Sequence, residues 1–135
     1  MVTVIPTAFP CSRVRWGDNG GAVVVGRRMN GITNEVATDL YLLPRAITRD
    51  ELTGENTLKW TAKYGSGSVE GLDGMNKKGL SGSMLWLAES DFGPFDPSRP
   101  SMSVARWLQY YLDNFATVKE AVDHPPKAPD AIGRR

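Results

Sequence analysis

The sequence predicts a single α+β domain, with strands in its first half and helix near its end. The chain has 135 residues, which is the size of one domain. Its composition, 41% hydrophobic and 23% charged, is close to the average of globular proteins and unlike that of disordered or collagen-like chains. Apolar residues recur at alternate positions in the first half and at helical spacing after residue 103. These observations predict a core in which strands pack against helix.

Five segments of the first ninety residues have the alternating or β-branched pattern of strands. They are residues 12–16, 22–26, 39–43, 57–63 and 84–87. The Gly- and Asn-containing segment between the first two predicts a β-hairpin, and Pro44 ends the third. In the fourth, period-two spacing puts Leu58, Trp60 and Ala62 on one face.

Helix is expected only in the last third of the chain. One apolar face has the i, i+3, i+4, i+7, i+8 spacing of a helix, namely Val104, Trp107, Leu108, Tyr111 and Leu112. Thr117 and Glu120 match a capping box, which predicts a second short helix starting at Thr117. The Pro-rich residues 93–100 are expected to be a connector. The aromatic side chains of the first helix are expected in the core, and residues 124–135 are expected to be a disordered tail.

Charge and residue counts exclude several function classes. Sixteen Lys and Arg balance 15 Asp and Glu without a basic cluster longer than a pair, so no nucleic-acid partner is expected. No apolar run approaches the roughly 18 residues of a membrane-spanning helix, so no membrane partner is expected. One Cys and one His cannot form an intrachain disulfide or a His/Cys metal site. No metal and no cofactor are expected.

Cys11 is the one candidate nucleophilic cysteine, and it has two interpretations. A lone cysteine is more often a small buried side chain. As a nucleophile it needs a base, and His124 is a poor one because it lies in the proline-rich tail. If the chain is cut before Cys11, the freed α-amino group supplies the base. Residues 1–10 are then a leader or the remnant of a signal, and both an exported and a cytoplasmic location stay open.

Several motifs carry a resemblance to a known family. They are Cys11-Ser-Arg-Val, Gly26-Arg27-Arg28-Met29, Leu43-Pro44-Arg45, Trp60-Thr-Ala-Lys-Tyr-Gly65 and, most specific, Asp73-Gly-Met-Asn-Lys-Lys-Gly-Leu80. Over residues 11–123 the chain resembles the N-terminal part of the choloylglycine hydrolase family, the linear amide C–N hydrolases of the penicillin V acylase and bile salt hydrolase type. The resemblance implies an N-terminal nucleophile hydrolase with an αββα sandwich. It also implies hydrolysis of a small-molecule amide, other than a peptide bond, through a cysteine acyl-enzyme, without cofactor or metal.

Four site residues follow from this resemblance. Cys11 matches the nucleophile, and Arg27 matches an arginine beside the thiolate, although without the family context Arg27 is a solvated hairpin arginine. Asn30 stands where the family has an aspartate that supports the α-amino group; Asn can accept a hydrogen bond but brings no charge. Ser83 is the nearest match to an oxyanion-hole asparagine. Asp73 and Asn76 are expected to shape a turn, with Gly74 at a positive φ.

The chain is expected to be a truncated member of the family. Family members are substantially longer, and their later active-site Asn and Arg have no counterpart within the 135 residues. One substantial helix also cannot cover the apolar faces of all the expected strands. The alternatives are a catalytically inactive remnant and a small binding domain that covers its strands by forming a homo-oligomer.

Overall fold

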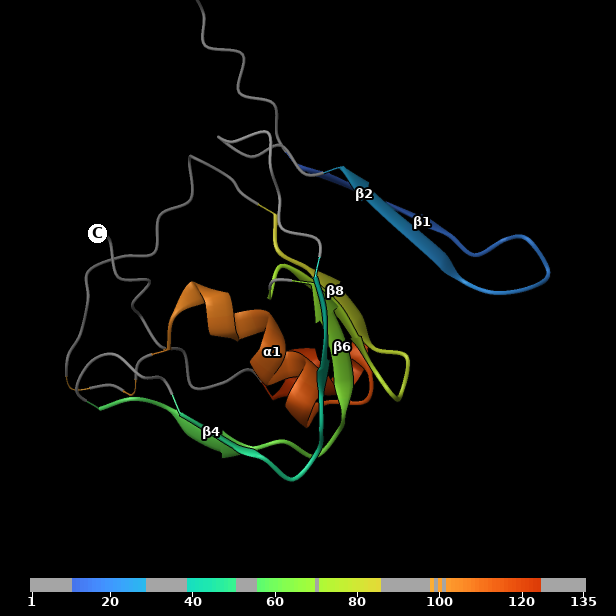
Figure 1. The fold of residues 1–135 in the computed structure, drawn as a ribbon. Helices are drawn as coiled ribbons and strands as arrows, with labels where there is room; N and C mark the ends of the chain where they lie inside the picture. Colours follow the sequence, from blue (N-terminus) through green and yellow to red (C-terminus); the bar gives the residue numbers. More distant parts are fainter. Residues whose placement is uncertain are drawn as a thin grey trace, which may run out of the picture. The chain divides into compact units, whose positions relative to one another are not determined.

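The computed structural model describes residues 11–28, 39–50, 56–69, 71–85, 98, 100 and 102–124. Over these residues the chain forms strands β1 (Ser12–Trp16), β2 (Val24–Arg28), β3 (Leu40–Leu43), β4 (Thr48–Asp50), β5 (Lys59–Thr61), β6 (Ser66–Val69), β7 (Asp73–Asn76) and β8 (Ser81–Ser83), and helices α1 (Val104–Asn114) and α2 (Val118–Asp123) (Figure 1). They fall into two compact units. The hairpin β1–β2 belongs to the first unit, and the other elements belong to the second.

The predicted hairpin is confirmed, but its second strand starts two residues later than expected. Residues 22 and 23 belong to the loop, because the Asn19 side chain donates from Nδ2 to the Ala22 carbonyl (2.9 Å) and accepts from the Gly21 N–H (2.9 Å). Gly20 has φ 67° in this loop, a conformation that glycine adopts without strain. The strands pair antiparallel from Ser12 opposite Arg28 to the loop.

The second unit is built on a four-stranded antiparallel sheet in the order β3-β6-β7-β8, together with the two-stranded ribbon β4–β5. Helix α1 packs on one face of the four-stranded sheet (Figure 1). The contact is close because the sheet presents glycines to the helix: a Cβ on Gly74 would lie 2.6 Å from Leu112 Cδ1, and one on Gly82 would overlap Leu108 Cδ1. Small residues in β7 and β8 therefore set the helix–sheet distance.

The Asp73–Asn76 segment corrects an expectation. It forms strand β7 rather than a turn, and Gly74 is not among the glycines with positive φ. Gly74 is required instead by the helix above it. The turn lies just after the strand, at residues 77–80, where Gly79 has φ 84°.

Asn76 ties that turn to the end of α1. Its Oδ1 accepts from the backbone N–H groups of Lys78 (3.0 Å) and Leu80 (3.1 Å). Its Nδ2 donates to the carbonyls of Leu112 (2.9 Å) and Phe115 (2.7 Å). The side chain is buried and all four of its hydrogen-bonding positions are used.

The predicted helices are confirmed, but the buried face of α1 differs from the apolar one. Leu108 and Leu112 are buried as expected, together with the polar Gln109 and Asp113, while Trp107 is 38% exposed. The face of α1 that carries Gln109 and Asp113 points into the protein, because Asp113 has hydrogen-bond partners there. Helix α2 starts with the expected cap: Thr117 Oγ1 accepts from the Glu120 N–H (3.1 Å).

Asp113 is the centre of a buried polar network. Its Oδ2 accepts hydrogen bonds from Arg49 Nε (2.6 Å) and Trp60 Nε1 (2.7 Å), and its Oδ1 accepts from Gln109 Nε2 (2.7 Å). Gln109 Nε2 also donates to Ser66 Oγ (3.0 Å). The Asp113 side chain is 0% exposed and that of Arg49 is 9% exposed. The Asp113 carboxylate thus joins α1 to β4 and β5, and Gln109 joins α1 to β6.

The aromatic side chains form a cluster around this network. Trp60 and Phe115 are buried, and Tyr110 meets both of them edge to face. Burial raises the pKa of Tyr110 above its usual value of 10.0, and the neighbouring Tyr111 raises it further. The three aromatic side chains of α1 that were expected in the core lie at its edge instead: Tyr110 and Tyr111 are half-buried, and the exposed Trp107 stacks on Tyr111.

Three of the remaining expectations concern strands and loops. The fourth expected strand is shorter, Lys59–Thr61, and it buries Trp60 as predicted. Residues 84 and 85 lie outside the preceding strand β8, so the part of the 84–87 strand that the structure describes is not formed. Residues 1–10 and 125–135, and nearly all of 93–100, lie outside the described residues.

Candidate active site

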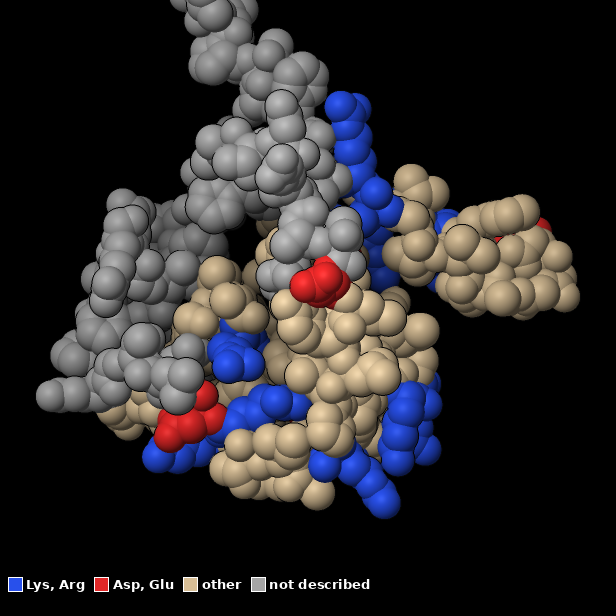
Figure 2. All heavy atoms as spheres, viewed as in Figure 1, with Lys and Arg blue, Asp and Glu red and all other residues tan. Residues whose placement is uncertain are grey.

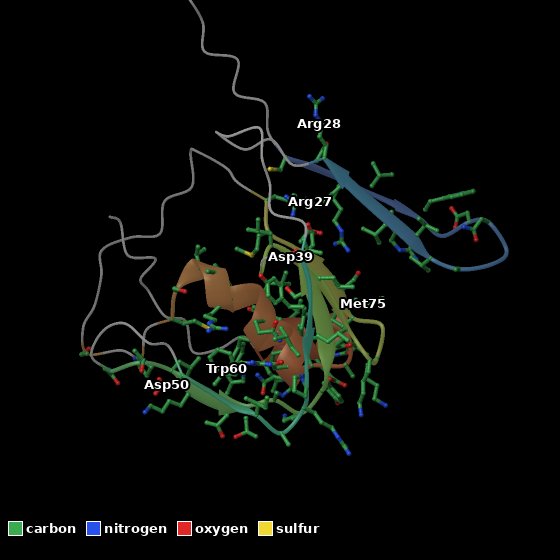
Figure 3. All side chains as sticks on the ribbon, in the orientation of Figure 1. Arg27, Arg28, Asp39, Asp50, Trp60 and Met75 are labelled. Carbon is green, nitrogen blue, oxygen red and sulfur yellow. The ribbon has the colours of Figure 1, made fainter. Side chains whose placement is uncertain are left out.

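The β1–β2 hairpin groups Cys11 with Arg27. Cys11 directly precedes β1 and is half-buried. In the strand register Arg13 lies opposite Arg27, and Ser12 lies opposite Arg28. Because side chains alternate between the two faces of a ribbon, Cys11 shares a face with Arg13 and Arg27. Arg28 belongs to the opposite face; Figure 3 labels both arginines of β2.

The spacing on that face suits a contact between the thiol and a guanidinium. Arg27 is diagonally across the ribbon from Cys11, an arrangement in which the two residues are about 7–8 Å apart and long side chains reach one another. An arginine beside a cysteine favours the thiolate over the thiol. The hairpin therefore has a cysteine thiol and a positive charge on the same face.

Arg13 is a residue of this face that the sequence reasoning missed. It is two residues from Cys11 and directly opposite Arg27 in the register. Like charges in directly opposite positions destabilise a ribbon, so two arginines here favour an anion between or beside them. The sequence could have indicated it, because Cys11 and Arg13 are two residues apart and side chains two apart on a strand point to the same face.

Neither Ser83 nor Asn30 belongs to the described part of the β1–β2 hairpin. Ser83 ends β8, opposite Asp73 and half-buried, in the second unit. Asn30 lies outside the described residues. The roles of both residues stay predictions.

Two other kinds of site are absent from the described residues. No three or more His, Cys, Asp or Glu side chains in these segments are grouped so that they could hold a metal ion. Among the same residues no helix has the length and apolar character needed to span a bilayer.

Comparison with known proteins decides the family. A sequence model of the choloylglycine hydrolase family, described as linear amide C–N hydrolases, matches residues 11–127. The chain belongs to this family. The match begins at Cys11 and includes the hairpin, the sheet and both helices, so the resemblance inferred from the motifs is confirmed.

Two penicillin V acylases illustrate the relationship. The enzyme of Pectobacterium atrosepticum is 43% identical over 129 residues, which cover 85% of this chain and 34% of the acylase. The structure of penicillin V acylase from Agrobacterium tumefaciens superposes with a TM-score of 0.74 at 43% identity, covering 87% of this chain and 38% of that one. The α+β class and the N-terminal nucleophile hydrolase fold are therefore confirmed. The chain spans little more than a third of the length of these relatives.

Proposed function

We propose that this chain carries the nucleophile of a linear amide C–N hydrolase and that Cys11 is that nucleophile. The observation that supports the proposal most directly is the β1–β2 register, which puts Arg27 on the same face as Cys11. Family membership supports the reaction class. The substrate would be a small-molecule amide, and no cofactor enters the reaction.

The reaction begins with removal of residues 1–10, which frees the α-amino group of Cys11. This amine accepts the proton of the thiol, and the sulfur attacks the amide carbonyl carbon. The C–N bond then breaks, the departing amine takes the proton from the α-ammonium group, and the acyl group stays on sulfur as a thioester. Water, deprotonated by the α-amino group, attacks the thioester and releases the acid.

Three further side chains would assist these steps. The Arg27 guanidinium stabilises the thiolate. The Asn30 amide oxygen accepts a hydrogen bond from the α-amino group and orients it. The Ser83 hydroxyl donates to the oxyanion of the tetrahedral intermediate, a contribution that is typically worth about 100- to 1000-fold in rate when one donor is removed.

The test is the intact mass of protein expressed from Met1, combined with the rate at which Cys11 reacts with a thiol reagent at pH 7. Loss of residues 1–10, fast labelling and release of the acyl group from penicillin V are expected, with penicillin V chosen because both relatives carry its name. An uncleaved chain whose thiol reacts no faster than a free cysteine would refute the proposal. The inactive-remnant alternative would then hold.

A pair of neighbouring arginines provides the matched control. Arg27→Gln removes the positive charge on the face of Cys11, and Arg28→Gln removes one on the opposite face. We expect the first change to slow labelling of Cys11 about tenfold, which corresponds to one unit in the ionisation of a thiol. The second is expected to leave the rate within about twofold. Equal effects would contradict the assigned face.

A further inference from the structure

The loop of the β1–β2 hairpin contains an Asn-Gly pair, Asn19 and Gly20. An asparagine can lose its side-chain amide when the backbone nitrogen of the next residue attacks the side-chain carbonyl carbon, Cγ, and closes a succinimide ring. Glycine as the next residue leaves the most room for this attack, because it has no Cβ. Whether the pair reacts in a folded protein depends on which of its atoms are buried or held in hydrogen bonds.

The nitrogen that would attack is accessible in this loop. Gly20 is exposed, has φ 67°, and has no atom within 4 Å of the position that a Cβ would take. Its N–H donates no hydrogen bond within the described part of the chain. No hydrogen bond therefore has to break, and no neighbouring group has to move, before this nitrogen reaches Asn19.

The side chain of Asn19 is held in a way that favours the attack. The Gly21 N–H donates to its Oδ1 (2.9 Å). This hydrogen bond closes a ring that contains both reacting atoms, the Asn19 Cγ and the Gly20 nitrogen. The donor also withdraws electrons from Cγ and faces the oxygen that becomes negatively charged during the attack. The loop thus positions and polarises the amide that would be lost.

Two asparagines of the second unit have surroundings that oppose the same reaction. The nitrogen that follows Asn76 belongs to Lys77, whose N–H donates to the Gly65 carbonyl (2.9 Å). The nitrogen that follows Asn114 belongs to Phe115, whose N–H donates into the last turn of α1 (3.1 Å). Asn76 is buried as well. Each nitrogen must give up a hydrogen bond before it can attack.

Asn56 is the remaining asparagine among the described residues. It is followed by Thr57, whose β-branched side chain crowds the nitrogen, and its own Nδ2 donates to the Ser98 carbonyl (3.2 Å). Within the described segments, the surroundings of Asn19 are therefore the ones that favour loss of the amide.

We propose that Asn19 is a site of spontaneous deamidation, at which the hairpin loop converts asparagine into aspartate and isoaspartate without an enzyme. The Gly20 nitrogen gives its proton to water and bonds to Cγ. The bond between Cγ and Nδ2 then breaks, and Nδ2 takes a proton from water and leaves as ammonia. Water opens the succinimide at either of its carbonyls. The reaction consumes water, releases ammonia and does not involve Cys11, so it is independent of the proposed hydrolase activity.

The product changes the loop in which it forms. The Asn19 Nδ2 donates to the Ala22 carbonyl (2.9 Å); in aspartate an oxygen takes its place, and two acceptors then face each other. In isoaspartate the backbone also runs through the side chain, which lengthens the loop. Residues 17–23 contain one charged residue, Asp18, and the loop end of the hairpin, at the right of Figure 2, consists mostly of uncharged residues. The added carboxylate brings the formal net charge of the chain from +1 to zero.

The experiment stores the purified 135-residue chain at pH 7, below its melting temperature, and follows each asparagine by mass spectrometry of tryptic peptides. Trypsin cleaves after Arg15 and Arg27, which isolates Asn19 in peptide 16–27, apart from every other asparagine. We expect Asn19 to be converted at least about tenfold faster than the asparagines that end β7 and α1, because those nitrogens must first lose a hydrogen bond. Isoaspartate, detected with an isoaspartyl methyltransferase, is expected beside aspartate. Aspartate alone would mean that water attacks Cγ directly, and would overturn the proposal.

Two neighbouring glycines provide matched variants. Gly20→Ala puts a methyl group beside the attacking nitrogen. Gly21→Ala leaves that nitrogen unchanged and keeps the N–H that binds Asn19 Oδ1, from which its Cβ would be 3.5 Å, an ordinary contact. We expect the first change to slow conversion at least about tenfold and the second to leave the rate within about twofold. Equal rates in the two variants would contradict attack by the Gly20 nitrogen.

A synthetic peptide of residues 16–27 tests the contribution of the fold. Asn19 is expected to react at least as fast in the folded chain as in the peptide, because the Gly21 N–H holds and polarises its amide only in the loop. Asn76 is expected to show the opposite behaviour and to react faster when urea unfolds the chain. Conversion of Asn19 that is slower in the folded chain than in the peptide would overturn the proposal, and so would conversion no faster than that of Asn76.

Discussion

Replacing Asp113 by Asn tests how far one buried carboxylate holds the second unit together. The change keeps the size of the side chain and removes the charge that faces Arg49 Nε at 2.6 Å. Arg49 is then a buried cation without its anion, and its Nη2 is buried without a hydrogen-bond partner among the described residues. Breaking a buried ion pair in this way costs about 3–5 kcal/mol. Domains are stable by about 5–15 kcal/mol, so the change is expected to remove a large part of the free energy of unfolding of this unit.

The assay is urea denaturation followed by circular dichroism. We expect Asp113→Asn to lower the midpoint by at least about 1 M urea, given slopes of about 1–3 kcal/mol per M for small proteins. Asp123→Asn is the control, because Asp123 pairs with Lys119 on the surface of α2 with both side chains exposed. Such pairs contribute about 0.5 kcal/mol or less. Equal midpoints for the two variants would refute the central role of Asp113.

Three further changes test the packing and the backbone. Gly82→Ala puts a methyl group into Leu108 and is expected to lower the free energy of unfolding by about 1–3 kcal/mol, whereas Gly26→Ala, with nothing within 4 Å, should change the melting temperature little. Ala46 has φ 64°, so Ala46→Gly is expected to raise the free energy of unfolding by up to about 1 kcal/mol. A decrease in the free energy of unfolding, which is the usual effect of Ala→Gly, would contradict backbone strain at Ala46. The pKa of Tyr110 is raised in the folded protein. The free energy of unfolding that the neutral Tyr110 contributes is therefore fully present below pH 10 and is lost as the pH rises through the pKa of the folded state. Tyr110→Phe should therefore unfold less readily than the original chain in alkaline titrations, and identical profiles would argue against this account.

The elements that could be predicted from sequence are those whose side chains follow a period. The hairpin, β3, β5 and both helices have β-branched or apolar residues at regular spacing, and each was found close to its expected place. Strand β4 was missed, as were strands β6, β7 and β8. The sequences of the last three, Ser66–Val69, Asp73–Asn76 and Ser81–Ser83, consist mainly of Gly, Ser, Asp and Asn, which disfavour strands. Contact with α1 requires small residues there, so tertiary packing overrides local preference.

The candidate site was predicted from motifs rather than from periodicity. Cys11 and Arg27 were identified by the family resemblance, and the register then supplied a physical reason for their association. Arg13 was missed because the face of a strand residue depends on pairing partners that the sequence does not state. The buried face of α1 was misjudged for a similar reason. Asp113 reads as a solvated residue until Arg49, 64 positions away, is placed beside it.

The four hydrogen bonds of Asn76 limit which amino acids can occupy its position. Two donors and a carbonyl on a one-carbon stem occur together in asparagine; aspartate lacks the donors, and glutamine carries the same group one carbon farther out. In a library that randomises each described position, we expect position 76 to accept fewer residue types than exposed positions of β7 such as Met75. Tolerance to substitution would then follow the number of hydrogen bonds a side chain satisfies more closely than its hydrophobicity.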